Sequence, residues 1–344
     1  MIALGIMAIL ARHSLSIAAF AFAIVGDASA ADAGSGYAAR PEVREFVTAL
    51  AEEHRFNAPE LMRLFSQVQT QNSALNAMNK PYATPPKWFE YSPPFVATAR
   101  VDGGVAYWNA NRRALERAER EYGVPAEIVV AIVGVETFYG RISGKYRVID
   151  ALTTLAFDYP RRAEFFREEL KQFLLLTREL KIPPLSAKGS FAGAMGVPQF
   201  MPTSFRRFGV DFDGDGKIDL WSDNDDVIGS VANFLQLHGW QRGAPILFSA
   251  DVDPSGAQNL MGDNGLSPMR EYGEWAAQNV TARTRSEIDP HAPAMLVQLD
   301  ERDGPAYRLG FTNFHVLRQY NRSRLYASAV WELAQAIRKA RAAQ

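Results

Sequence analysis

The sequence predicts a mainly α-helical protein with one small β element. Most of the chain alternates between stretches whose apolar residues recur three and four positions apart and short segments rich in Pro or Gly. Only one pair of segments, near the C-terminus, resembles a β-hairpin. With 344 residues, 47% of them hydrophobic, the chain can form a sizeable core in one or two domains.

The first third of the chain predicts helices separated by one irregular segment. Residues 41–78 have helical spacing throughout. The segment "KPYATPPKWFEYSPPF" has too many prolines for a regular element and is predicted to be an ordered loop with aromatic residues. "VAYWNANRRALERAEREYG" then predicts one amphipathic helix, which Gly123 ends.

The next helix is the most apolar one. It reads "PAEIVVAIVGVET", with Pro125 in its first turn and Gly140 suited to its C-cap. Two further helices are predicted in "RRAEFFREELKQFLLLTREL" and "VIGSVANFLQLHGW", and between them lies a Gly-rich segment whose glycines are expected to admit a sugar chain.

The last third contains the β element. Residues 251–275 are rich in Gly, Pro, Asp and Asn and predict a loop. "AMLVQLD" and "AYRLGF", joined by "ERDGP", predict a β-hairpin, and a final helix is expected from about Ser323 to the end of the chain. The sequence shows no internal repeat.

The N-terminal residues predict a cleaved signal peptide. A basic pair, Arg12 and His13, precedes an apolar stretch that ends in Ala28-Ser29-Ala30, an A-x-A cleavage site. An anchor helix is the alternative, but the polar "GDASA" end favours cleavage after Ala30. We therefore expect an exported, periplasmic protein. Because the chain contains no Cys, neither disulfides nor a lipid-modified N-terminal cysteine is expected.

Several function classes are disfavoured by composition and by missing motifs. Lys plus Arg (37) nearly balance Asp plus Glu (38), so no basic excess indicates nucleic-acid binding. The five His form no H-E-x-x-H motif, and neither a G-x-S-x-G elbow nor a Cys nucleophile is present. The Gly-rich segment lacks Rossmann spacing. We expect no organic cofactor and a monomeric protein.

Glu136 is the one carboxylate that ends the apolar helix, with no charged residue between it and Glu127. Burial in an apolar helix and the negative end of the helix dipole should both raise its pKa. A pKa between about 6 and 7 would suit a general acid near neutral pH. A buried Glu paired with an Arg explains the pattern equally well.

No partner carboxylate for Glu136 is evident in the sequence. Glycosidases normally use two carboxylates. Glu127 lies nine residues earlier, which places it on the opposite face of the helix, and no other acid shares the face of Glu136. One acid without a partner is unusual for a hydrolase.

Five ordered motifs resemble those of the membrane-bound lytic murein transglycosylase B family. They are "GVETFYGR", "DYPRRAEFF", "GSFAGAMGVPQFMPTSF", "DFDGDGKIDLW" and "YNRSRLYA". The resemblance covers about Pro41 to Arg338 and implies a lysozyme-like catalytic core with a flanking helical region and a small β region. It also implies an enzyme that acts on peptidoglycan glycan strands and cleaves the MurNAc–GlcNAc β-1,4 bond without water.

In the mechanism that the resemblance implies, one glutamate protonates the glycosidic oxygen and then helps the C6 hydroxyl of MurNAc attack C1. The product is a 1,6-anhydro ring, and the nucleophile belongs to the substrate. No second carboxylate is required, and Glu136 matches the family's catalytic acid and base.

The resemblance also implies a set of substrate-binding residues. These are Ser190, Gln199, Tyr320, Asn321, Tyr326, Arg161, Arg162 and Tyr91. Structural roles are open for several of them. Asn321 or Ser323 could cap a helix, and Gln199 could satisfy backbone groups in its Gly-rich turn. Phe234 departs from the family, which often has Tyr there.

The segment "DFDGDGKID" predicts a structural calcium site. Asp211, Asp213 and Asp215 occupy EF-hand positions 1, 3 and 5, and Lys217 offers its backbone carbonyl at position 7. Gly216 suits the sharp turn at position 6 and Asp219 stands at position 9. Position 12 is Ser222 rather than Glu. The resemblance implies that a later acid closes the site, with Asp226 the best match and Asp225 next to it. A solvated Asp/Gly turn is the alternative.

These patterns divide the chain into five parts. They are a signal peptide (1–30), an N-terminal helical region (31–122), a lysozyme-like core (123–250) with an EF-hand-like loop (211–226), a loop and hairpin region (251–310), and the C-terminal part of the core (311–344).

Protein partners in cell-wall synthesis or turnover complexes are conceivable for such an enzyme, but no interaction motif identifies one. The two competing interpretations are a lysozyme-like hydrolase that activates water and a calcium-stabilised glycan-binding protein without turnover.

Overall fold

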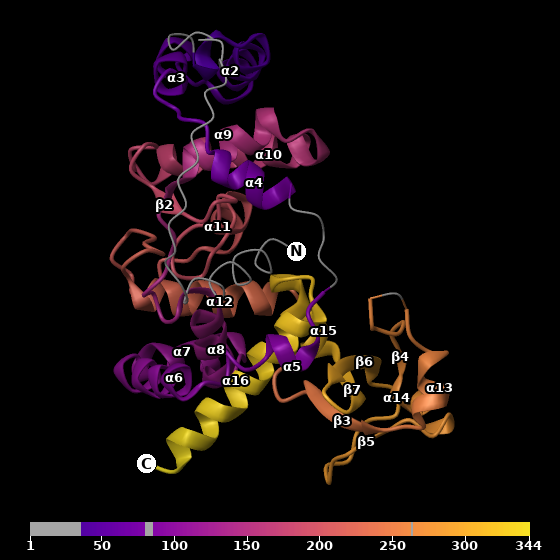
Figure 1. Ribbon diagram of the computed structural model, residues 1–344. Helices are drawn as coiled ribbons and strands as arrows, with labels where there is room; N and C mark the ends of the chain where they lie inside the picture. The colour runs from indigo at the N-terminus through magenta and orange to yellow at the C-terminus, as the bar shows by residue number, and fades with distance from the viewer. Residues whose placement is uncertain (1–35, 80–84, 263) are drawn as a thin grey trace, which may run out of the picture.

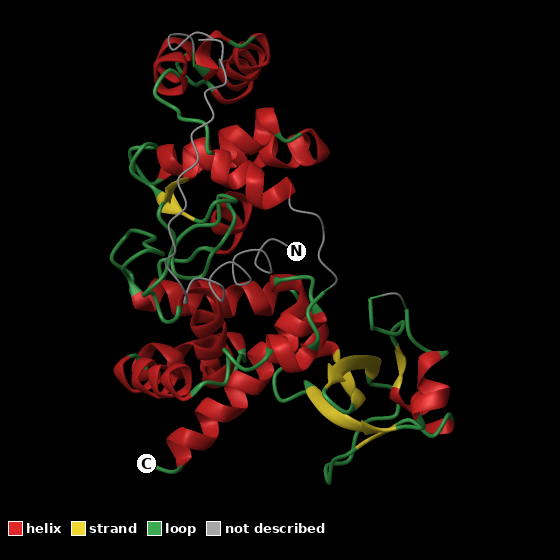
Figure 2. Cartoon of the chain, viewed as in Figure 1, coloured by secondary structure: helices red, strands yellow, loops and turns green. Residues whose placement is uncertain are grey.

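The computed structural model describes residues 36–79, 85–262 and 264–344 (Figure 1). The predicted signal peptide lies outside these residues. The predicted fold class is confirmed, because helices make up most of the described chain and the larger of its two small sheets forms a lobe of its own (Figure 2). None of the described helices is long and apolar enough to cross a lipid bilayer.

The described residues contain seventeen helices, two of them 3-10 helices. They are 3-10 helix η1 (Tyr37–Ala39), α2 (Pro41–His54), α3 (Ala58–Phe65), α4 (Asn72–Asn79), α5 (Trp88–Tyr91), α6 (Thr98–Ala110), α7 (Arg112–Tyr122), α8 (Ala126–Thr137), α9 (Val148–Asp158), η2 (Pro160–Arg162), α10 (Ala163–Glu179), α11 (Pro202–Phe208), α12 (Asn224–Leu237), α13 (Pro254–Gln258), α14 (Tyr272–Ala277), α15 (Thr312–Tyr320) and α16 (Arg324–Ala342).

The apolar helix α8 is the centre of the helical body. It packs against α6, α7, α12 and α16, so its whole circumference is covered. All residues from Ile128 to Val133 are fully buried. A helix that is apolar all round needs this environment, since it has no face that suits water.

The predicted β-hairpin is confirmed as β6 (Pro293–Glu301) and β7 (Gly304–Phe311). Their antiparallel register runs from Ala294 opposite Phe311 to Glu301 opposite Gly304. They form the centre of a five-stranded sheet with the order β4-β6-β7-β3-β5, whose other strands are β3 (Leu247–Asp251), β4 (Arg270–Glu271) and β5 (Thr281–Ala282). A second, two-stranded ribbon pairs β1 (Tyr146–Arg147) with β2 (Lys188–Gly189).

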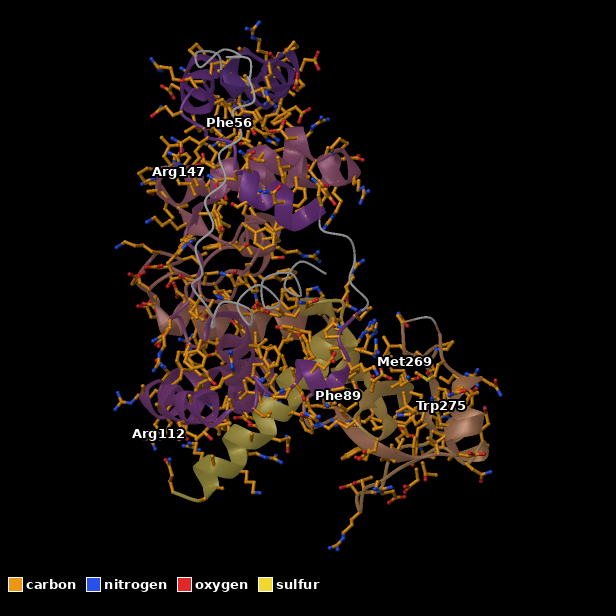
Figure 3. The ribbon with its side chains drawn as sticks, viewed as in Figure 1. Phe56, Phe89, Arg112, Arg147, Met269 and Trp275 are labelled. Carbon is orange, nitrogen blue, oxygen red and sulfur yellow. The ribbon has the colours of Figure 1, made fainter. Side chains whose placement is uncertain are left out.

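The sheet lobe has its own small core around Trp275 and contacts the helical body through α5. The guanidinium of Arg302 lies 5.1 Å from the ring centroid of Phe89, and that of Arg308 lies 5.9 Å from the ring of Trp88. Figure 3 shows Phe89 at this junction and Trp275 inside the lobe. Side chains of the hairpin therefore support α5 directly.

Several predicted boundaries were wrong. The helix expected over residues 105–123 is two helices, because Asn111 interrupts it and its Nδ2 donates to the Tyr107 carbonyl at 2.8 Å. The proline-rich loop contains one helical turn, α5. The loop expected over residues 251–275 contains α13, β4 and the start of α14, since tertiary packing against the hairpin stabilises elements that its composition disfavours.

The final helix begins as expected, and Ser323 is its N-cap. The Ser323 Oγ accepts a hydrogen bond from the amide of Tyr326 at 3.3 Å. Replacing Ser323 by Ala should lower the free energy of unfolding by about 1 kcal/mol, whereas Gly should lower it by only a few tenths. Urea unfolding of both variants measures this. Equal stabilities of the Ala variant and the parent would contradict the capping role.

Candidate active site at the end of helix α8

Three consecutive left-handed residues end α8 directly after Glu136 and Thr137. Their φ angles are 52° at Phe138, 62° at Tyr139 and 82° at Gly140. The amides of Phe138 and Tyr139 donate to the carbonyls of Gly134 and Val133. Phe138, and not Gly140, is thus the C-cap, which corrects the sequence prediction. Left-handed backbone is unfavourable for Phe and Tyr, and such residues often cluster at functional sites.

Thr137, which sequence reasoning missed, fixes this helix end. Its buried Oγ1 donates to the Val197 carbonyl at 3.0 Å and accepts from the Gly140 amide at 3.1 Å. A polar residue in the last turn of an otherwise apolar helix is the signal that could have revealed it. The contact joins the Glu136 turn to the Gly-rich segment.

Glu136 itself is partly exposed and has one hydrogen-bond partner among the described residues. The hydroxyl of Tyr326 donates to its Oε1 at 2.6 Å. Burial raises the pKa of Glu136 to about 7, while the Tyr326 hydrogen bond acts in the opposite direction. At neutral pH the carboxyl group therefore exists in both protonated and ionised forms.

The described residues include no ion pair to Glu136, so its explanation as a structural Glu–Arg pair is not supported. Glu127 is engaged elsewhere. Its Oε1 lies 3.6 Å from the guanidinium of Arg338, at the other end of α8.

Three tyrosines surround the carboxyl group. Tyr320 and Tyr326 stack at 6.3 Å with an interplanar angle of 11°, and the Tyr320 hydroxyl donates to the Pro198 carbonyl at 2.7 Å. Burial and the charge of Glu136 raise the pKa of Tyr91, Tyr320 and Tyr326. The structure thus brings three of the predicted binding residues to the acid. Asn321, which follows Tyr320 as the C-cap of α15, is buried.

Ser190 and Gln199 shape the backbone of the Gly-rich segment. The Ser190 Oγ accepts hydrogen bonds from the amides of Ala192 and Ala194. The Gln199 Nε2 donates to the carbonyls of Ser143 and Gly196, both at 2.9 Å. Both residues therefore satisfy backbone groups, which is the structural role that the sequence left open for Gln199. They also hold their segment beside the end of α8.

The glycines of this segment do not have the expected role. A Cβ added at Gly189 would lie 2.1 Å from the Ala194 carbonyl oxygen. In the facing segment after α8, a Cβ at Gly144 would lie 2.1 Å from the Gly189 carbonyl oxygen. At Gly196 it would lie 2.4 Å from the Leu220 carbonyl oxygen. These glycines admit neighbouring backbone of the same chain rather than open space for a sugar, which corrects the sequence prediction.

Arg161 and Arg162 lie in η2, before α10. The guanidinium of Arg162 covers the rings of Phe165 and Phe166 at 4.2 and 5.4 Å, and Arg161 is exposed. In the described part of the chain, no hydrogen bond or ring contact joins either arginine to Glu136 or its tyrosines. Their part in a binding site stays a prediction.

The acidic loop brings three of the predicted metal ligands together. Carboxylate oxygens of Asp211, Asp213 and Asp226 lie within 4.8 Å of one another. Asp226 is buried, and its Oδ1 and Oδ2 accept from the amides of Phe212 and Asp219 at 2.6 and 2.7 Å. Burial raises the pKa of Asp226. Among the described residues this group includes Asp226 and not Asp225.

The residues present fit a hard divalent cation. Hard cations such as Ca²⁺ prefer several carboxylate and carbonyl oxygens, and three converging carboxylates would repel one another without one. Gly214 and Gly216, with φ of 84° and 89°, permit the tight turn. Amides of Gly214, Asp215 and Gly216 donate to the Asp211 carboxylate and orient it.

Comparisons with known proteins identify the family of this chain. Residues 38–335 match the family described as the transglycosylase SLT domain. The chain is 41% identical, over 317 residues, to the membrane-bound lytic murein transglycosylase B of Escherichia coli K12, and the match covers 90% of this chain and 86% of that protein.

Solved structures of lytic transglycosylases also resemble this chain. The soluble lytic transglycosylase SltB1 from Pseudomonas aeruginosa is 46% identical, with a TM-score of 0.83 over 88% of this chain and 100% of that one. The Escherichia coli lytic transglycosylase Slt35 in complex with calcium is 41% identical, with a TM-score of 0.82 over 90% of this chain and 96% of that one.

A more distant structure, SltB3 from Pseudomonas aeruginosa in complex with NAG-NAM-pentapeptide, is 32% identical, with a TM-score of 0.76 over 86% of this chain and 79% of that one. The sequence family, the relatives and the lysozyme-like fold that they share all agree. The chain belongs to the lytic transglycosylase family that the transglycosylase SLT domain defines.

Proposed function

We propose that this protein cleaves the MurNAc–GlcNAc β-1,4 bond of peptidoglycan glycan strands and forms 1,6-anhydroMurNAc, with Glu136 as the only acid and base. The observation that carries the proposal is a single carboxyl group with a pKa near 7 and no partner carboxylate or cation among the described residues. Its relatives are named lytic transglycosylases.

The proposed reaction needs one proton and no water. Protonated Glu136 donates its proton to the glycosidic oxygen while the bond from that oxygen to C1 of MurNAc breaks. The resulting carboxylate accepts the proton of the C6 hydroxyl as its oxygen attacks C1. Glu136 ends the cycle protonated, and the two products together contain the atoms of the substrate.

The surrounding residues would hold the glycan. Tyr91, Tyr320 and Tyr326 offer rings and hydroxyls around the acid, while Ser190, Gln199 and Asn321 belong to segments that fix its position. Arg161 and Arg162 would bind peptide carboxylates or glycan oxygens. Phe234 lacks the hydroxyl of a tyrosine and instead packs against Phe200 and Tyr320.

The experiment that tests the proposal is mass spectrometry of muropeptides released from purified sacculi. We expect products one water lighter than the corresponding reducing-end disaccharides, and none of them with Glu136→Gln. Reducing-end products would instead show that water is the nucleophile, as in a lysozyme-like hydrolase. Binding to sacculi without release by the parent would indicate a glycan-binding protein.

The Tyr326 hydroxyl should tune the acid. Because its hydrogen bond lowers the pKa of Glu136, Tyr326→Phe should raise that pKa further and move the alkaline limb of the pH–rate profile to higher pH. Losing a bond to a charged group, about 1.4 kcal/mol, should also lower kcat roughly tenfold. Tyr320→Phe is the control, since its hydroxyl donates to Pro198 and should leave the limb in place. Identical limbs in all three proteins would contradict this role.

We also propose a structural Ca²⁺ held by side chains of Asp211, Asp213, Asp215 and Asp226 and by the carbonyl of Lys217. The converging carboxylates and the calcium complex of Slt35 support it.

The predicted signal peptide supports export to the periplasm, where a monomeric enzyme would meet its glycan substrate and where partners in cell-wall complexes would also occur. The five-part division of the chain remains a proposal, in which α6 and α7 pack on the core helices α8 and α12.

A further inference from the structure

Arg100, in the first turn of α6, is a half-buried cation without an anionic partner. It forms no ion pair among the described residues, and burial lowers the pKa of its guanidinium. A cation in the first turn of a helix also opposes the helix dipole. Both features disfavour an arginine here on local grounds, so its long-range contacts must compensate.

The Arg100 guanidinium contacts α8 on both sides of Glu136. Its Nη1 donates a hydrogen bond to the carbonyl of Gly134, which precedes the acid in the last turn of the helix. Its central carbon lies 4.8 Å from the ring centroid of Phe138, the left-handed residue that ends the helix after the acid. Arg100 therefore holds the end of α8 across the turn that carries the carboxyl group.

The same guanidinium contacts the segment that follows Tyr91. Its Nε donates to the Pro94 carbonyl at 3.1 Å, and its central carbon lies 5.5 Å from the ring centroid of Phe95. The Phe95 side chain is buried, and its ring lies 5.0 Å from that of Tyr91. One side chain thus joins the Tyr91 segment to the end of α8 through four contacts, which we call the Arg100 clamp.

The backbone of Arg100 is fixed against the same helix end. The hydroxyl of Tyr139, which follows Phe138, donates to the Arg100 carbonyl at 2.7 Å. A Cβ added at Gly103 in α6 or at Gly134 in α8 would lie 2.9 or 2.6 Å from the Tyr139 side chain. These two glycines therefore make room for the Tyr139 ring between the helices, and the guanidinium extends from a defined place.

Tyr91 depends on ring packing more than the other two tyrosines beside the acid. The hydroxyls of Tyr320 and Tyr326 each donate a hydrogen bond, whereas that of Tyr91 makes none among the described residues. The Tyr91 ring instead lies 6.2 and 5.0 Å from the rings of Trp88 and Phe95. Ring packing therefore sets where this hydroxyl lies, and the Arg100 clamp holds one of the two rings.

We propose that Arg100 is a positioning residue that places Tyr91 beside the catalytic acid. This rests on the proposed function, in which Tyr91 and Glu136 meet the same glycan strand. Among the described residues, the groups that respond to the charge of the acid are the three tyrosines, and Arg100 is not one of them. Arg100 therefore acts on the acid through the ring that it holds rather than through its own charge.

The test measures the pKa of Glu136 in Arg100→Met, which removes the donors and keeps an unbranched apolar side chain. Once Tyr91 is released, water reaches the carboxyl group, and its pKa should fall by about 0.5 to 1 towards the ordinary value of 4.5. The alkaline limb of the pH–rate profile should move to lower pH by the same amount, and kcat should fall about tenfold. Carboxyl ¹³C NMR reads the pKa directly, with the resonance assigned by its loss in Glu136→Gln.

A double-mutant cycle with Tyr91→Ala separates positioning from a general loss of stability. If Arg100 acts through Tyr91, adding Arg100→Met to Tyr91→Ala should lower neither the pKa of Glu136 nor kcat any further. Equal effects of Arg100→Met in the two backgrounds would overturn the proposal, and so would an unchanged pKa in the single Arg100→Met variant.

Arg100→Lys covers the case in which Arg100→Met does not fold. It keeps a cation between the rings of Phe95 and Phe138, but an ammonium group lacks the fork of N–H donors with which the guanidinium reaches two carbonyls. At least half of the fall in the pKa of Glu136 should therefore remain. A pKa equal to that of the parent would refute the Arg100 clamp.

Arg178→Met is the matched control. Arg178, in α10, also donates to a carbonyl, that of His54 at 2.8 Å, and also lies over a ring, that of Phe56 at 4.0 Å. Figure 3 shows Phe56 far from Phe89, which belongs to α5. This variant should leave the pKa of the acid and kcat unchanged, and a fall as large as that in Arg100→Met would count against the proposal.

The two proposals fail in different ways. If the parent releases no anhydro products from sacculi, the proposed reaction is wrong. The NMR titration needs no turnover, so it still tests the Arg100 clamp in the parent, Arg100→Met, Tyr91→Ala and the double variant. A pKa of Glu136 that falls equally in the three variants supports the inference, and one that Arg100→Met leaves unchanged refutes it.

Discussion

Replacing Glu136 by Gln is expected to abolish cleavage of sacculi, with at least about a 1,000-fold loss of kcat. Gln is nearly isosteric and its carbonyl can still accept from Tyr326, so the site keeps its shape. It has no proton to give to the glycosidic oxygen. Muropeptide release, measured over pH 5 to 9, checks this.

The parent's pH dependence follows from the same group. Since burial raises the pKa of Glu136 to about 7, the protonated form dominates below that pH and is lost above it. We expect kcat/KM to fall about tenfold for each pH unit above 7. A plateau that extends to pH 9 would show that another group supplies the proton.

The same substitution should stabilise the fold at alkaline pH. The unfolded chain binds the proton with an ordinary pKa of about 4.5, so ionisation disfavours the folded state increasingly as pH rises from 4.5 to about 7. Gln removes this penalty, which we expect to be about 2 kcal/mol at pH 8 and absent near pH 4. Urea unfolding at both pH values is the measurement. Equal stabilities at pH 8 would contradict a desolvated carboxyl group.

The second large effect concerns the acidic loop. With calcium at 100 times its dissociation constant, binding stabilises the folded state by about 2.7 kcal/mol, which a chelator should remove. Asp213→Asn should lose this gain but resemble the chelated parent otherwise, because its side-chain oxygen can still accept from the Asp215 amide.

Asp226→Asn should be more severe. Both carboxylate oxygens accept backbone amides, and an amide side chain would turn its NH₂ towards one of these donors. We expect a further loss of about 2 kcal/mol that persists in chelator. Thermal unfolding of the parent and both variants, with calcium and with chelator, separates the two contributions. Parent stability that ignores the chelator would refute the metal site.

The sequence predicted best what depends on neighbours along the chain. The uninterrupted apolar surface of α8 indicated its burial and the isolation of Glu136, and alternate Asp residues indicated the metal loop. The hairpin turn was equally local, since only Arg302 and Asp303 lie between the paired strands.

What depends on distant segments was not predicted. Thr137 matters because Val197 lies beside it, and the glycines matter because backbone from three places in the chain meets there. Phe138 in a left-handed conformation was equally hidden, because a Gly two positions later was the better local candidate for a cap. Such roles arise from tertiary contacts, to which a single sequence gives little access.

The support that the hairpin gives to α5 has a consequence for how this enzyme can diversify. Arg302 and Arg308 hold the helical turn that ends in Tyr91, and Tyr91 lies close enough to feel the charge of Glu136. A surface turn in a separate lobe is therefore mechanically linked to a hydroxyl beside the acid. Turns tolerate substitution far better than packed helices. Substitutions in this turn, which destabilise the fold less than substitutions in a packed helix, can thus adjust the active site.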